Sequence, residues 1–559
     1  MTVTRNGPLG AISLLLCLAS GAVEAQSAAP ALPGSVGRPP QAAAGQPSEP
    51  AMVTPSISVD LAAGVQPPPG LENEEIDVAD LQIEGMTVYP RETFPEIYAM
   101  VGKTVTLGAL YKATNAITKR YVDDGYALSL AYIPEQSIGD GAFRIAVIEG
   151  KVDQVSVEGV TGALVDTITR LARKTLTGGP ARVADLERAL LLINDLPGVR
   201  ATGVLRPAKS GASGGSELVV QATHKPFSVG FTLDNRGTRY VGPMQGLIDV
   251  NSASAAGFGE SIRVVALGSA TIRRQRYVGV DVAIPIGDDG LRFESSVSRS
   301  LSVPGNELTA FNVESDTTSV EGALAYPLIR STQFSLTLSG GFRAVDSRSL
   351  IDKALNYEDR LRALRFALSF ESNGWLDGVT RGALRFTQGL PAFNASGGSD
   401  RTSRIKVSKT GNFASMELGR LQPLGDGFDI WAQGEAQYAF TTIASYDEYA
   451  IGGSRFGRAF EPGEITGRQG WGGSVELRYS FSDILSSADR AQVYLFADTG
   501  TVWNTARMQT LSSSGAGIRL DTGIGVDGYI EYAQVLGRPE AASVRTPDQR
   551  IWAGVRVQY

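Results

Sequence analysis

The chain has 559 residues, of which 43% are hydrophobic, and its 58 acidic and 51 basic side chains give a formal net charge of −7. This composition supplies apolar material for folded cores and excludes wholesale disorder, and the negative charge disfavours a general nucleic-acid-binding protein. One cysteine and one histidine leave little material for the common metal centres and nucleophile–base pairs, so an enzyme is disfavoured as well.

Residues 1–25 have the features of a secretory signal peptide. A basic start precedes the short apolar stretch from Leu9 to Ala19, and the segment closes at Ala25, a small residue of the kind that signal peptidase requires. The apolar stretch is too short to span a membrane as a helix. Cys17 lies inside this segment, so the mature chain is expected to contain no cysteine and to fold without disulfide bonds.

Residues 26–76 are predicted to form an extended linker. Ten prolines fall between residues 27 and 70, among many alanines, glycines and serines, and this composition favours a solvated segment over packed structure. At about 3.1 Å per residue, a polyproline-like segment of this length reaches on the order of 100 Å. The linker is therefore either a simple spacer or a segment long enough to thread through a membrane pore.

Residues 77–225 are predicted to form two small α+β domains, 77–151 and 152–225. The pattern from Asp80 to Gly85 recurs from Asp153 to Gly159, and each copy is followed by helical spacing and then by two strands. The apolar faces of the two predicted helices comprise Leu110, Thr114, Ile117 and Tyr121, and Val183, Leu186, Leu190 and Ile193. Such domains pack helices on one face of a small sheet and leave an edge strand exposed.

Residues 226–559 change to alternating apolar and polar side chains with turn residues between the segments, which predicts strands throughout. The stretches 227–233 and 475–481 show the alternation most clearly. At roughly ten residues per membrane strand, with a similar allowance for turns and loops, this region holds about 16 strands.

Alternation also fits a soluble β-sandwich or propeller. The final strand, however, carries Val555 and Val557 in phase with the terminal Tyr559, whereas a soluble domain more often ends in a polar tail. This C-terminal signature favours a membrane barrel, in which lipid-facing apolar residues alternate with lumen-facing polar ones.

Four segments carry a further signal. They are YVDDGYALSLAYIPEQSIGDGAFRIAVIEGKV (121–152), LLLINDLPGVRATGVLRP (190–207), LDNRGTRYVG (233–242) and AYPLIRS (325–331). Together they resemble the outer-membrane transporters of two-partner secretion, the haemolysin secretion/activation family, and the resemblance extends over residues 77–559. It implies a transmembrane antiparallel β-barrel of about 16 strands preceded by two α+β POTRA domains, located in the outer membrane of a Gram-negative bacterium with the POTRA domains in the periplasm.

The resemblance also implies a loop that folds back into the barrel. In this family the long sixth loop carries a double glycine followed by a tip that contains an arginine. The segment GGSRFGRAF (452–460) supplies Gly452, Gly453, Arg458 and Phe460 at the matching positions. We expect these residues to hold the loop in the lumen.

The family's wall motif, F-x-D-x-G, is matched by Phe496, Asp498 and Gly500. On a strand, Phe496 and Asp498 point to the same face. The resemblance therefore implies an ion pair between Arg458 and Asp498 that pins the loop. A guanidinium can meet a carboxylate through two parallel hydrogen bonds, so this pairing is chemically suitable for a partly desolvated lumen.

The tip departs from the family pattern at two positions. Gly457 stands where valine is usual, and Ala459 stands where glycine is usual. Alanine resists the positive φ that glycine permits, which brings the backbone geometry of the tip into question. Arg455 is a competing partner for the wall carboxylate.

The function implied by the resemblance is secretion of an unfolded exoprotein through the barrel, without nucleotide hydrolysis, after recognition by the POTRA domains. The exoprotein is predicted to add a strand to an exposed sheet edge, at the strands around Val155 or Val204. The other expected partners are outer-membrane lipid and the machinery that assembles outer-membrane barrels. No nucleic acid, metal or cofactor is expected.

Two alternatives of other classes share part of this pattern. An insertase that assembles other outer-membrane proteins has the same barrel and loop motif but usually has more than two POTRA domains. A passive porin would need no domains ahead of its barrel. An enzyme is disfavoured because the sequence offers no convincing nucleophile and base.

Overall fold

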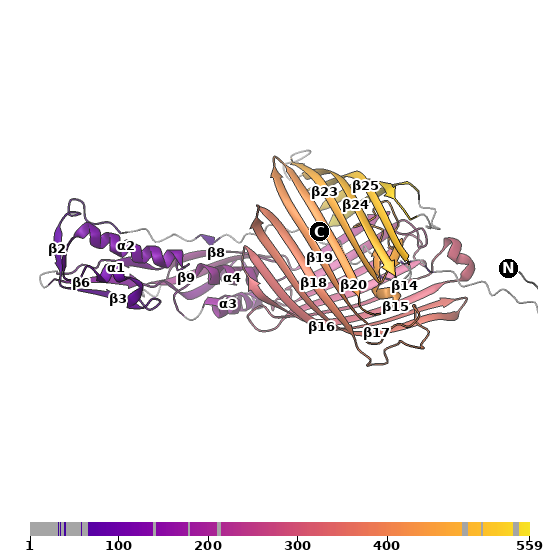
Figure 1. Cartoon of the computed structure of the whole chain (residues 1–559), viewed down its shortest axis with the longest axis horizontal. Helices are drawn as coiled ribbons and strands as arrows, with labels where there is room; N and C mark the ends of the chain where they lie inside the picture. The colour runs from indigo at the N-terminus through magenta and orange to yellow at the C-terminus, as the bar shows by residue number, and fades with distance from the viewer. Residues whose placement is uncertain are drawn as a thin grey trace, which may run out of the picture. The chain divides into compact units, whose positions relative to one another are not determined.

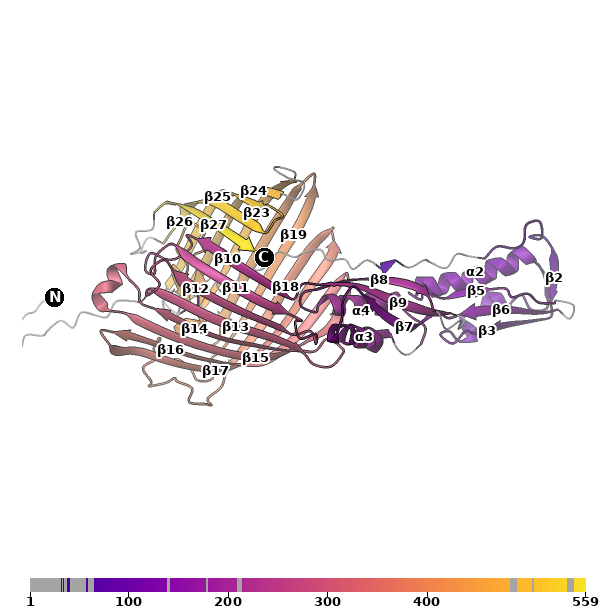
Figure 2. The ribbon, with the colours of Figure 1, turned by 180° about the vertical axis from the view of Figure 1, so that it is seen from behind.

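A computed structural model of the chain describes residues 32, 34, 38–40, 57–58, 65–137, 141–176, 179–208, 214–482, 490–504, 507–539 and 547–559. They form two small α+β domains and a closed β-barrel (Figures 1 and 2). The predicted signal peptide, residues 1–25, lies outside the described residues, as does most of the predicted linker. Within the described ranges, no helix combines the length and the apolar character needed to cross a membrane.

The first domain contains a three-stranded sheet that packs against helix α2, with a small two-stranded sheet beside it (Figure 1). Its elements are β2 (Glu75–Val78), β3 (Asp80–Glu84), η1 (Arg91–Thr93), α1 (Pro95–Tyr98), β4 (Lys103–Thr106), α2 (Leu107–Asp123), β5 (Leu130–Tyr132) and β6 (Ala142–Ile148). Helix α2 begins where the Thr106 side chain accepts a 3.2 Å hydrogen bond from the backbone N–H of Ala109. The predicted face with Leu110, Ile117 and Tyr121 is buried in the core.

Glu149, directly after β6, fixes the turn that follows β3. Its carboxylate accepts hydrogen bonds from the backbone N–H groups of Thr87 (2.6 Å) and Val88 (2.9 Å). The hydroxyl groups of Thr87 and Tyr121 also donate to it, the latter at 2.5 Å. Burial acts to raise the pKa of Glu149, but these hydrogen bonds outweigh burial and hold the pKa below its ordinary value.

We expect the E149Q variant to weaken the first domain by about 1–3 kcal/mol at neutral pH, because an amide nitrogen would face the hydroxyl donors. The folded-state pKa lies below the unfolded-state value of about 4.3, so the carboxylate contributes fully above that pH. Its contribution fades as the pH falls through the folded-state pKa. Local unfolding free energies from amide hydrogen exchange in the intact protein should therefore differ between wild type and variant near neutrality and converge in acid. A difference that grew in acid would contradict this role.

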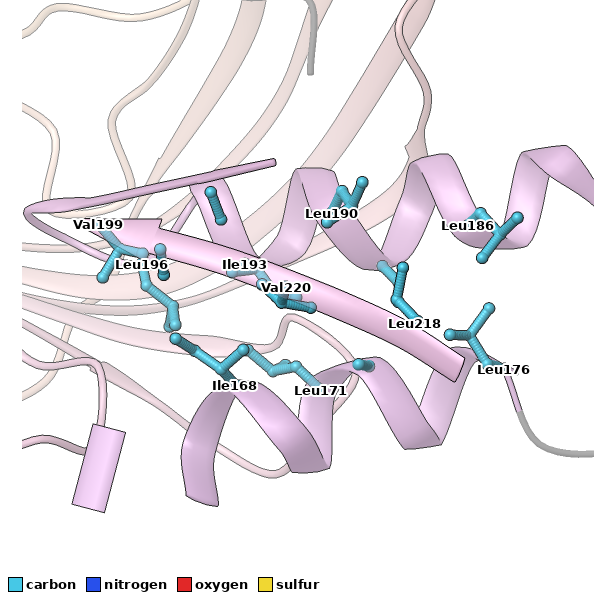
Figure 3. Packing of buried hydrophobic residues seen from close by; sticks show 14 of the residues in the cluster. Ile168, Leu171, Leu176, Leu186, Leu190, Ile193, Leu196, Val199, Leu218 and Val220 are labelled. Carbon is cyan, nitrogen blue, oxygen red and sulfur yellow. The ribbon is translucent and has the colours of Figure 1, made fainter. Parts of the chain in front are cut away.

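The second domain packs two helices against its sheet. Its elements are β7 (Lys151–Glu158), α3 (Ala163–Leu176), α4 (Val183–Asn194), β8 (Val199–Pro207) and β9 (Gly215–His224). Figure 3 shows the core, in which Ile168 and Leu171 of α3 share one buried cluster with Leu190 and Ile193 of α4. The sequence pattern described above predicts a single helix here, but the structure has two; Leu164, Ile168 and Leu171 have the helical spacing of α3.

The sheet of the second domain includes a piece of the linker, β1 (Ile57–Ser58), in the strand order β1–β8–β9–β7. β1 runs parallel to β8, with Ile57 opposite Gly203 and Ser58 opposite Val204. The predicted docking edge around Val204 is therefore already paired in part. Val155 lies in β7, at the other edge of the sheet.

The linker also contacts the loop that follows strand β20 (Phe428–Ala439). The Arg38 guanidinium donates a hydrogen bond to the carbonyl oxygen of Ser445. Gly34 lies so close to Thr466 that a Cβ atom would clash with that side chain. The described parts of the linker therefore contact both this loop and, through β1, the sheet of the second domain.

Sixteen antiparallel strands form the closed barrel, the number that the sequence predicted (Figures 1 and 2). They are β10 (Phe227–Asp234), β11 (Gln245–Ala253), β12 (Ser261–Ser269), β13 (Gln275–Pro285), β14 (Arg292–Ser302), β15 (Glu314–Arg330), β16 (Phe334–Ile351), β17 (Ala354–Trp375), β18 (Gly378–Gly389), β19 (Asn412–Gly425), β20 (Phe428–Ala439), β23 (Gln469–Ser482), β24 (Arg490–Asn504), β25 (Arg507–Asp521), β26 (Val526–Gly537) and β27 (Gln549–Gln558). A 3-10 turn, η2 (Asn306–Phe311), precedes β15. Leu477 and Leu495 are exposed on the outer face, whereas Glu476 and Asp498 are buried on the inner face.

The barrel closes between its first and last strands. β10 pairs with β27 over five positions, which include Val555 and Val557. Tyr559 extends this pairing by exchanging two backbone hydrogen bonds with Val229, at 2.9 and 3.1 Å. The residues of the C-terminal signature thus lie on the strand that completes the ring.

Candidate functional site

The loop between β20 and β23, residues 440–468, folds back into the barrel. It contains η3 (Ser445–Asp447) and a short hairpin made of β21 (Tyr449–Ile451) and β22 (Ile465–Gly467). The predicted double glycine follows β21, and Gly452 and Gly453 have φ angles of +112° and +103°. A Cβ atom at Gly452 would also collide with the carbonyl oxygen of Glu461. This turn therefore requires glycine.

Apolar side chains pack the loop onto the barrel wall. Ile451 and Phe460 are buried in one cluster with Phe496 of β24 and Trp552 of β27. Gly500, the last residue of the predicted wall motif, faces Ile451 so closely that any Cβ atom would clash with it. The glycine thus leaves the space that the loop fills.

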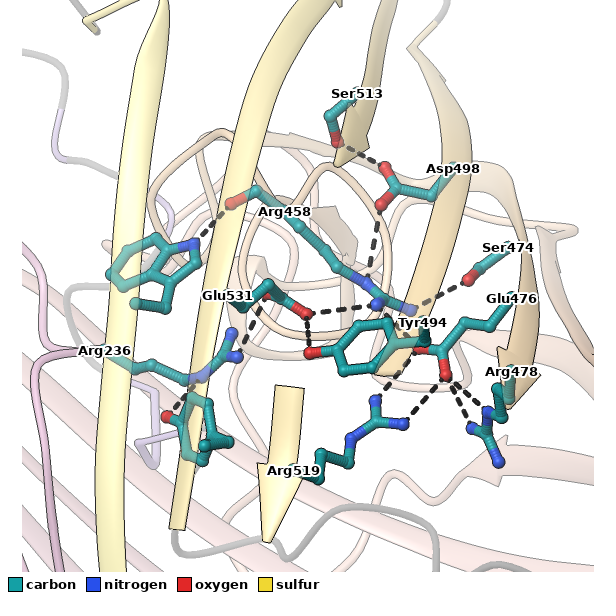
Figure 4. A network of polar contacts seen from close by, with 12 residues as sticks. Arg236, Arg458, Ser474, Glu476, Arg478, Tyr494, Asp498, Ser513, Arg519 and Glu531 are labelled. Atoms are coloured by element: carbon teal, nitrogen blue, oxygen red, sulfur yellow. Dashed lines mark hydrogen bonds and ion pairs between the residues drawn. The ribbon is translucent and has the colours of Figure 1, made fainter. Parts of the chain in front are cut away.

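Arg458, at the loop tip, is only 2% exposed and lies among three carboxylates of the wall (Figure 4). Its Nη1 lies 2.6 Å from Oε1 of Glu476 and 3.2 Å from Oε2 of Glu531. Its Nε lies 3.5 Å from Oδ2 of Asp498. The structure therefore brings the two predicted partners together, but theirs is the longest of the three ionic contacts. Nη2 donates a 3.0 Å hydrogen bond to Oγ of Ser474.

Asp498 holds the loop mainly through the loop backbone. Its Oδ1 accepts hydrogen bonds from the backbone N–H of Gly457 at 2.7 Å and from Oγ of Ser513 at 2.5 Å. The carboxylate therefore fixes the position of the residue that precedes Arg458, in addition to attracting its charge. A carboxylate that accepts a backbone N–H is a strong, charge-assisted partner.

Two aromatic side chains complete the contacts of Arg458. The guanidinium carbon lies 4.3 Å from the centre of the Phe496 ring, an arrangement that favours a cation over an aromatic face. The indole N–H of Trp552 donates a 2.7 Å hydrogen bond to the carbonyl oxygen of Arg458. The wall thus contacts the side chain and the backbone of this one residue.

Further arginines share the carboxylates of this cluster. Glu476 contacts Arg478 at 2.7 Å and Arg519 at 3.1 Å, as well as Arg458. Glu531 contacts Arg236 at 3.1 Å. Burying charges is costly unless they are paired and hydrogen-bonded, and here each carboxylate faces at least one arginine. Removal of any one of these charged side chains would therefore leave a neighbouring buried charge without its partner and destabilise the cluster.

Glu476 and Glu531 were not predicted as parts of the site. A signal for Glu476 was present, because it falls between the outward-facing Val475 and Leu477 and must point into the lumen. Alternation does not show that it meets Arg458, however. The contact between Glu476 and Arg458 depends on the register of strands β23 to β26. The sequence of a single strand does not determine that register.

The unusual residues of the loop tip are compatible with its backbone. The positive φ falls on Gly457, at +74°, and Ala459 is not among the residues with positive φ. Alanine therefore causes no strain at position 459. Arg455, the expected competitor for Asp498, pairs instead with Glu435 of β20.

Sequence comparisons relate this chain to known transporters. Residues 214–520 match the family described as haemolysin secretion/activation protein ShlB/FhaC/HecB, and residues 76–150 match the ShlB-type POTRA domain. The heme/hemopexin transporter protein HuxB of Haemophilus influenzae is 23% identical over 388 residues, and the match covers 66% of each chain, slightly under two thirds of that protein. The outer membrane transporter CdiB of Escherichia coli O6:K15:H31 is 22% identical over 478 residues, covering 82% of this chain and 79% of that protein.

Solved structures show the same fold. CdiB from Escherichia coli matches with a TM-score of 0.74 at 20% identity, covering 90% of this chain and 94% of that chain. CdiB from Acinetobacter baumannii matches with a TM-score of 0.65 at 15% identity, covering 89% and 91%. The barrel lies in the outer membrane, with the POTRA domains in the periplasm. Because the family match spans more than half of the sequence, the chain belongs to the haemolysin secretion/activation family of ShlB, FhaC and HecB, the outer-membrane transporters of two-partner secretion.

Proposed function

We propose that this transporter binds an unfolded exoprotein in the periplasm through its POTRA domains and conducts it through the barrel to the cell surface. The observation that carries this proposal is the loop inside the barrel. It is held by hydrogen bonds and ion pairs around Arg458, so it can be released without breaking a covalent bond. A pore with a removable internal obstruction suits regulated passage better than free diffusion.

The inner wall offers a polar path for an extended chain. Arg365 pairs with Glu321 at 2.6 Å, and Arg385 pairs with Glu417 at 2.7 Å. All four side chains are partly exposed, on strand faces opposite to outward-facing residues such as Phe366. Paired charges supply hydrogen-bonding groups without a strong field of one sign, so an unfolded chain can pass without being trapped.

The proposed energy source is the folding of the exoprotein outside the cell, without nucleotide hydrolysis. Folding removes the emerged segment from the pool of unfolded chain, so each step outward becomes harder to reverse. The periplasm supplies no nucleotide fuel. The direction of transport then comes from folding of the exoprotein. The transporter itself needs only to bind the exoprotein, open its pore and let the unfolded chain pass.

Reconstitution in liposomes tests this proposal. The probe is an N-terminal fragment of a candidate exoprotein, a large secreted protein of the same organism, added unfolded to vesicles whose POTRA domains face outward. We expect the fragment to become resistant to external protease without nucleotide, and vesicles without the transporter should give no protection. Protection that required ATP would contradict the proposed energetics. If the vesicles instead promoted insertion of an unfolded porin but gave no protection, the insertase alternative would replace secretion.

A further inference from the structure

The outer face of the barrel carries an apolar hollow with a volume of about 1050 Å³. It crosses the last strands, β23 to β27, which are labelled in Figure 2. Ala516, Gly528 and Ala553 form its floor, because they are small residues at outward positions of three neighbouring strands. Larger residues surround this floor, as Leu495 and Tyr532 do on either side of Ala516. The missing side-chain bulk at the three small positions leaves the hollow.

The lining of the hollow suits an apolar ligand. Its outward-facing side chains are apolar or aromatic, apart from Asn235. Leu495, Ile518 and Ile530 are 62%, 54% and 63% exposed, although each is a large apolar residue. Water would find few hydrogen-bonding partners in such a place, and an unfilled space would forfeit dispersion contacts. Because the barrel lies in the outer membrane, an acyl chain of a lipid can supply those contacts.

The hollow lies toward the periplasmic side of the wall. β10 follows the POTRA domains and runs toward the cell surface, so the antiparallel β27 ends on the periplasmic side. Antiparallel pairing places the later residues of β23 and β25 and the earlier residues of β24 and β26, which line the hollow, on that same side. Phe428 and Tyr479, at the rim, lie 4.6 Å apart between ring centres and fit the aromatic girdle of a membrane interface. The lipid that reaches the hollow is therefore phospholipid of the periplasmic leaflet.

The inner side of the same wall carries part of the ionic cluster at the loop tip. Gly517 and Gly554 line the hollow with their backbone, and a Cβ atom at either would collide with the ring of Tyr494 or Tyr529, respectively. The hydroxyl group of Tyr494 donates a 2.9 Å hydrogen bond to Glu531 of the cluster (Figure 4). At these two glycines, only backbone and a tyrosine ring separate the hollow from the cluster. A chain packed in the hollow would support the strands on which the cluster lies.

We propose that the hollow binds an acyl chain of a periplasmic-leaflet phospholipid, and that the bound chain stabilises the wall behind the ionic cluster. The volume lies at the upper end of the range for small-molecule sites, which suits a long flexible chain. The surrounding bilayer is itself apolar, so the hydrophobic effect does not favour the hollow over the bilayer. The stabilisation comes instead from van der Waals contacts that the empty hollow lacks. This site is independent of how the exoprotein is recognised.

Photo-crosslinking of the wild-type protein tests the site. The probe is phosphatidylethanolamine with a diazirine at the middle of one acyl chain, in vesicles of phosphatidylethanolamine and phosphatidylglycerol, and mass spectrometry locates the adducts. We expect severalfold more labelling of Leu495, Ile518 and Ile530 than of Leu338 and Leu384, which are 47% and 57% exposed but lie outside the hollow. Equal labelling of the two groups would reduce the hollow to ordinary lipid contact and overturn the site.

The mass of the adduct identifies the source of the chain. In outer membranes from cells grown with a diazirine fatty acid, adducts in the hollow should have the mass of a phospholipid. Adducts with the mass of lipid A would place the hollow in the outer leaflet and overturn the assignment. A crosslink to a second copy of this chain at the same residues would show that protein, not lipid, covers the hollow.

Filling the hollow tests the stabilising role. The A516F/A553F variant puts two rings on its floor, and A266F is the control because Ala266 is an outward-facing residue of β12 outside the hollow. Added phosphatidylethanolamine should raise the unfolding temperature of wild type and A266F in detergent by at least about 2 °C, as measured by heat-dependent migration on gels. A516F/A553F should show no such shift. An equal shift in all three proteins, or none in wild type, would overturn the stabilising role.

Discussion

Replacement of Arg458 by alanine should reduce export at least about tenfold while leaving the barrel inserted in the outer membrane. The variant leaves Glu476, Asp498 and Glu531 facing one another with their shared cation removed. Removing one partner from a buried ionic cluster costs about 3–5 kcal/mol, and about 1.4 kcal/mol corresponds to a factor of ten in an equilibrium. The loop should then lose its defined position and obstruct the lumen in many arrangements. Secretion of the exoprotein into the medium measures the effect.

Two companion variants separate this role from a general effect of charge. R455A removes a neighbouring arginine of the same loop whose partner is Glu435, and its side chain is 32% exposed, so export should change little. R458K keeps the charge but cannot contact Glu476, Asp498 and Ser474 together, so it should be intermediate. Heat-dependent migration on gels verifies that each barrel is folded. Normal export by R458A would remove the loop contact from the mechanism.

Deletion of residues 76–149 should abolish export without closing the pore. This segment contains the first POTRA domain and none of the barrel strands. If recognition depends on the POTRA domains, the truncated protein should insert, conduct ions in planar bilayers as the wild type does, and fail to bind the exoprotein fragment. Binding and conductance measured on one preparation distinguish loss of recognition from loss of the barrel.

E149Q serves as the control for that deletion, since it weakens the same domain without removing it. We expect E149Q to retain export at moderate temperature, because a loss of about 1–3 kcal/mol leaves most of a typical domain folded. Undiminished secretion after the deletion would show that the second domain alone recognises the cargo.

The architecture of the barrel could be predicted from sequence because its signal is local. A lipid-facing strand needs an apolar residue at every second position. The alternation in the few residues around Phe231 and around Leu477 therefore predicts which face of each strand points outward. Strand number then follows from length. The helix α2 was predictable for a similar reason, since Leu110, Ile117 and Tyr121 repeat at the period of a helix.

The features that the sequence does not predict depend on contacts between distant segments. β1 lies in a proline-rich stretch whose composition favours no strand, and its conformation comes from the edge of β8. The hairpin of β21 and β22 forms inside a loop, with the barrel wall as its support. The Arg458–Asp498 contact was expected from family resemblance alone, and the closer contact with Glu476 required the assembled strands.

The pairing of β10 with β27 has a consequence for biogenesis. Asp234 and Gly554 are neighbours across this junction although 320 positions separate them in the chain. Contacts between such distant segments carry a high entropic cost and form slowly. Until the last strand arrives, both β10 and the growing end of the sheet expose unpaired backbone, which lipid cannot satisfy. An assembly intermediate of this protein therefore needs a chaperone surface that covers two unpaired strand edges at once. Once β27 pairs with β10 and the barrel closes, that chaperone is no longer needed.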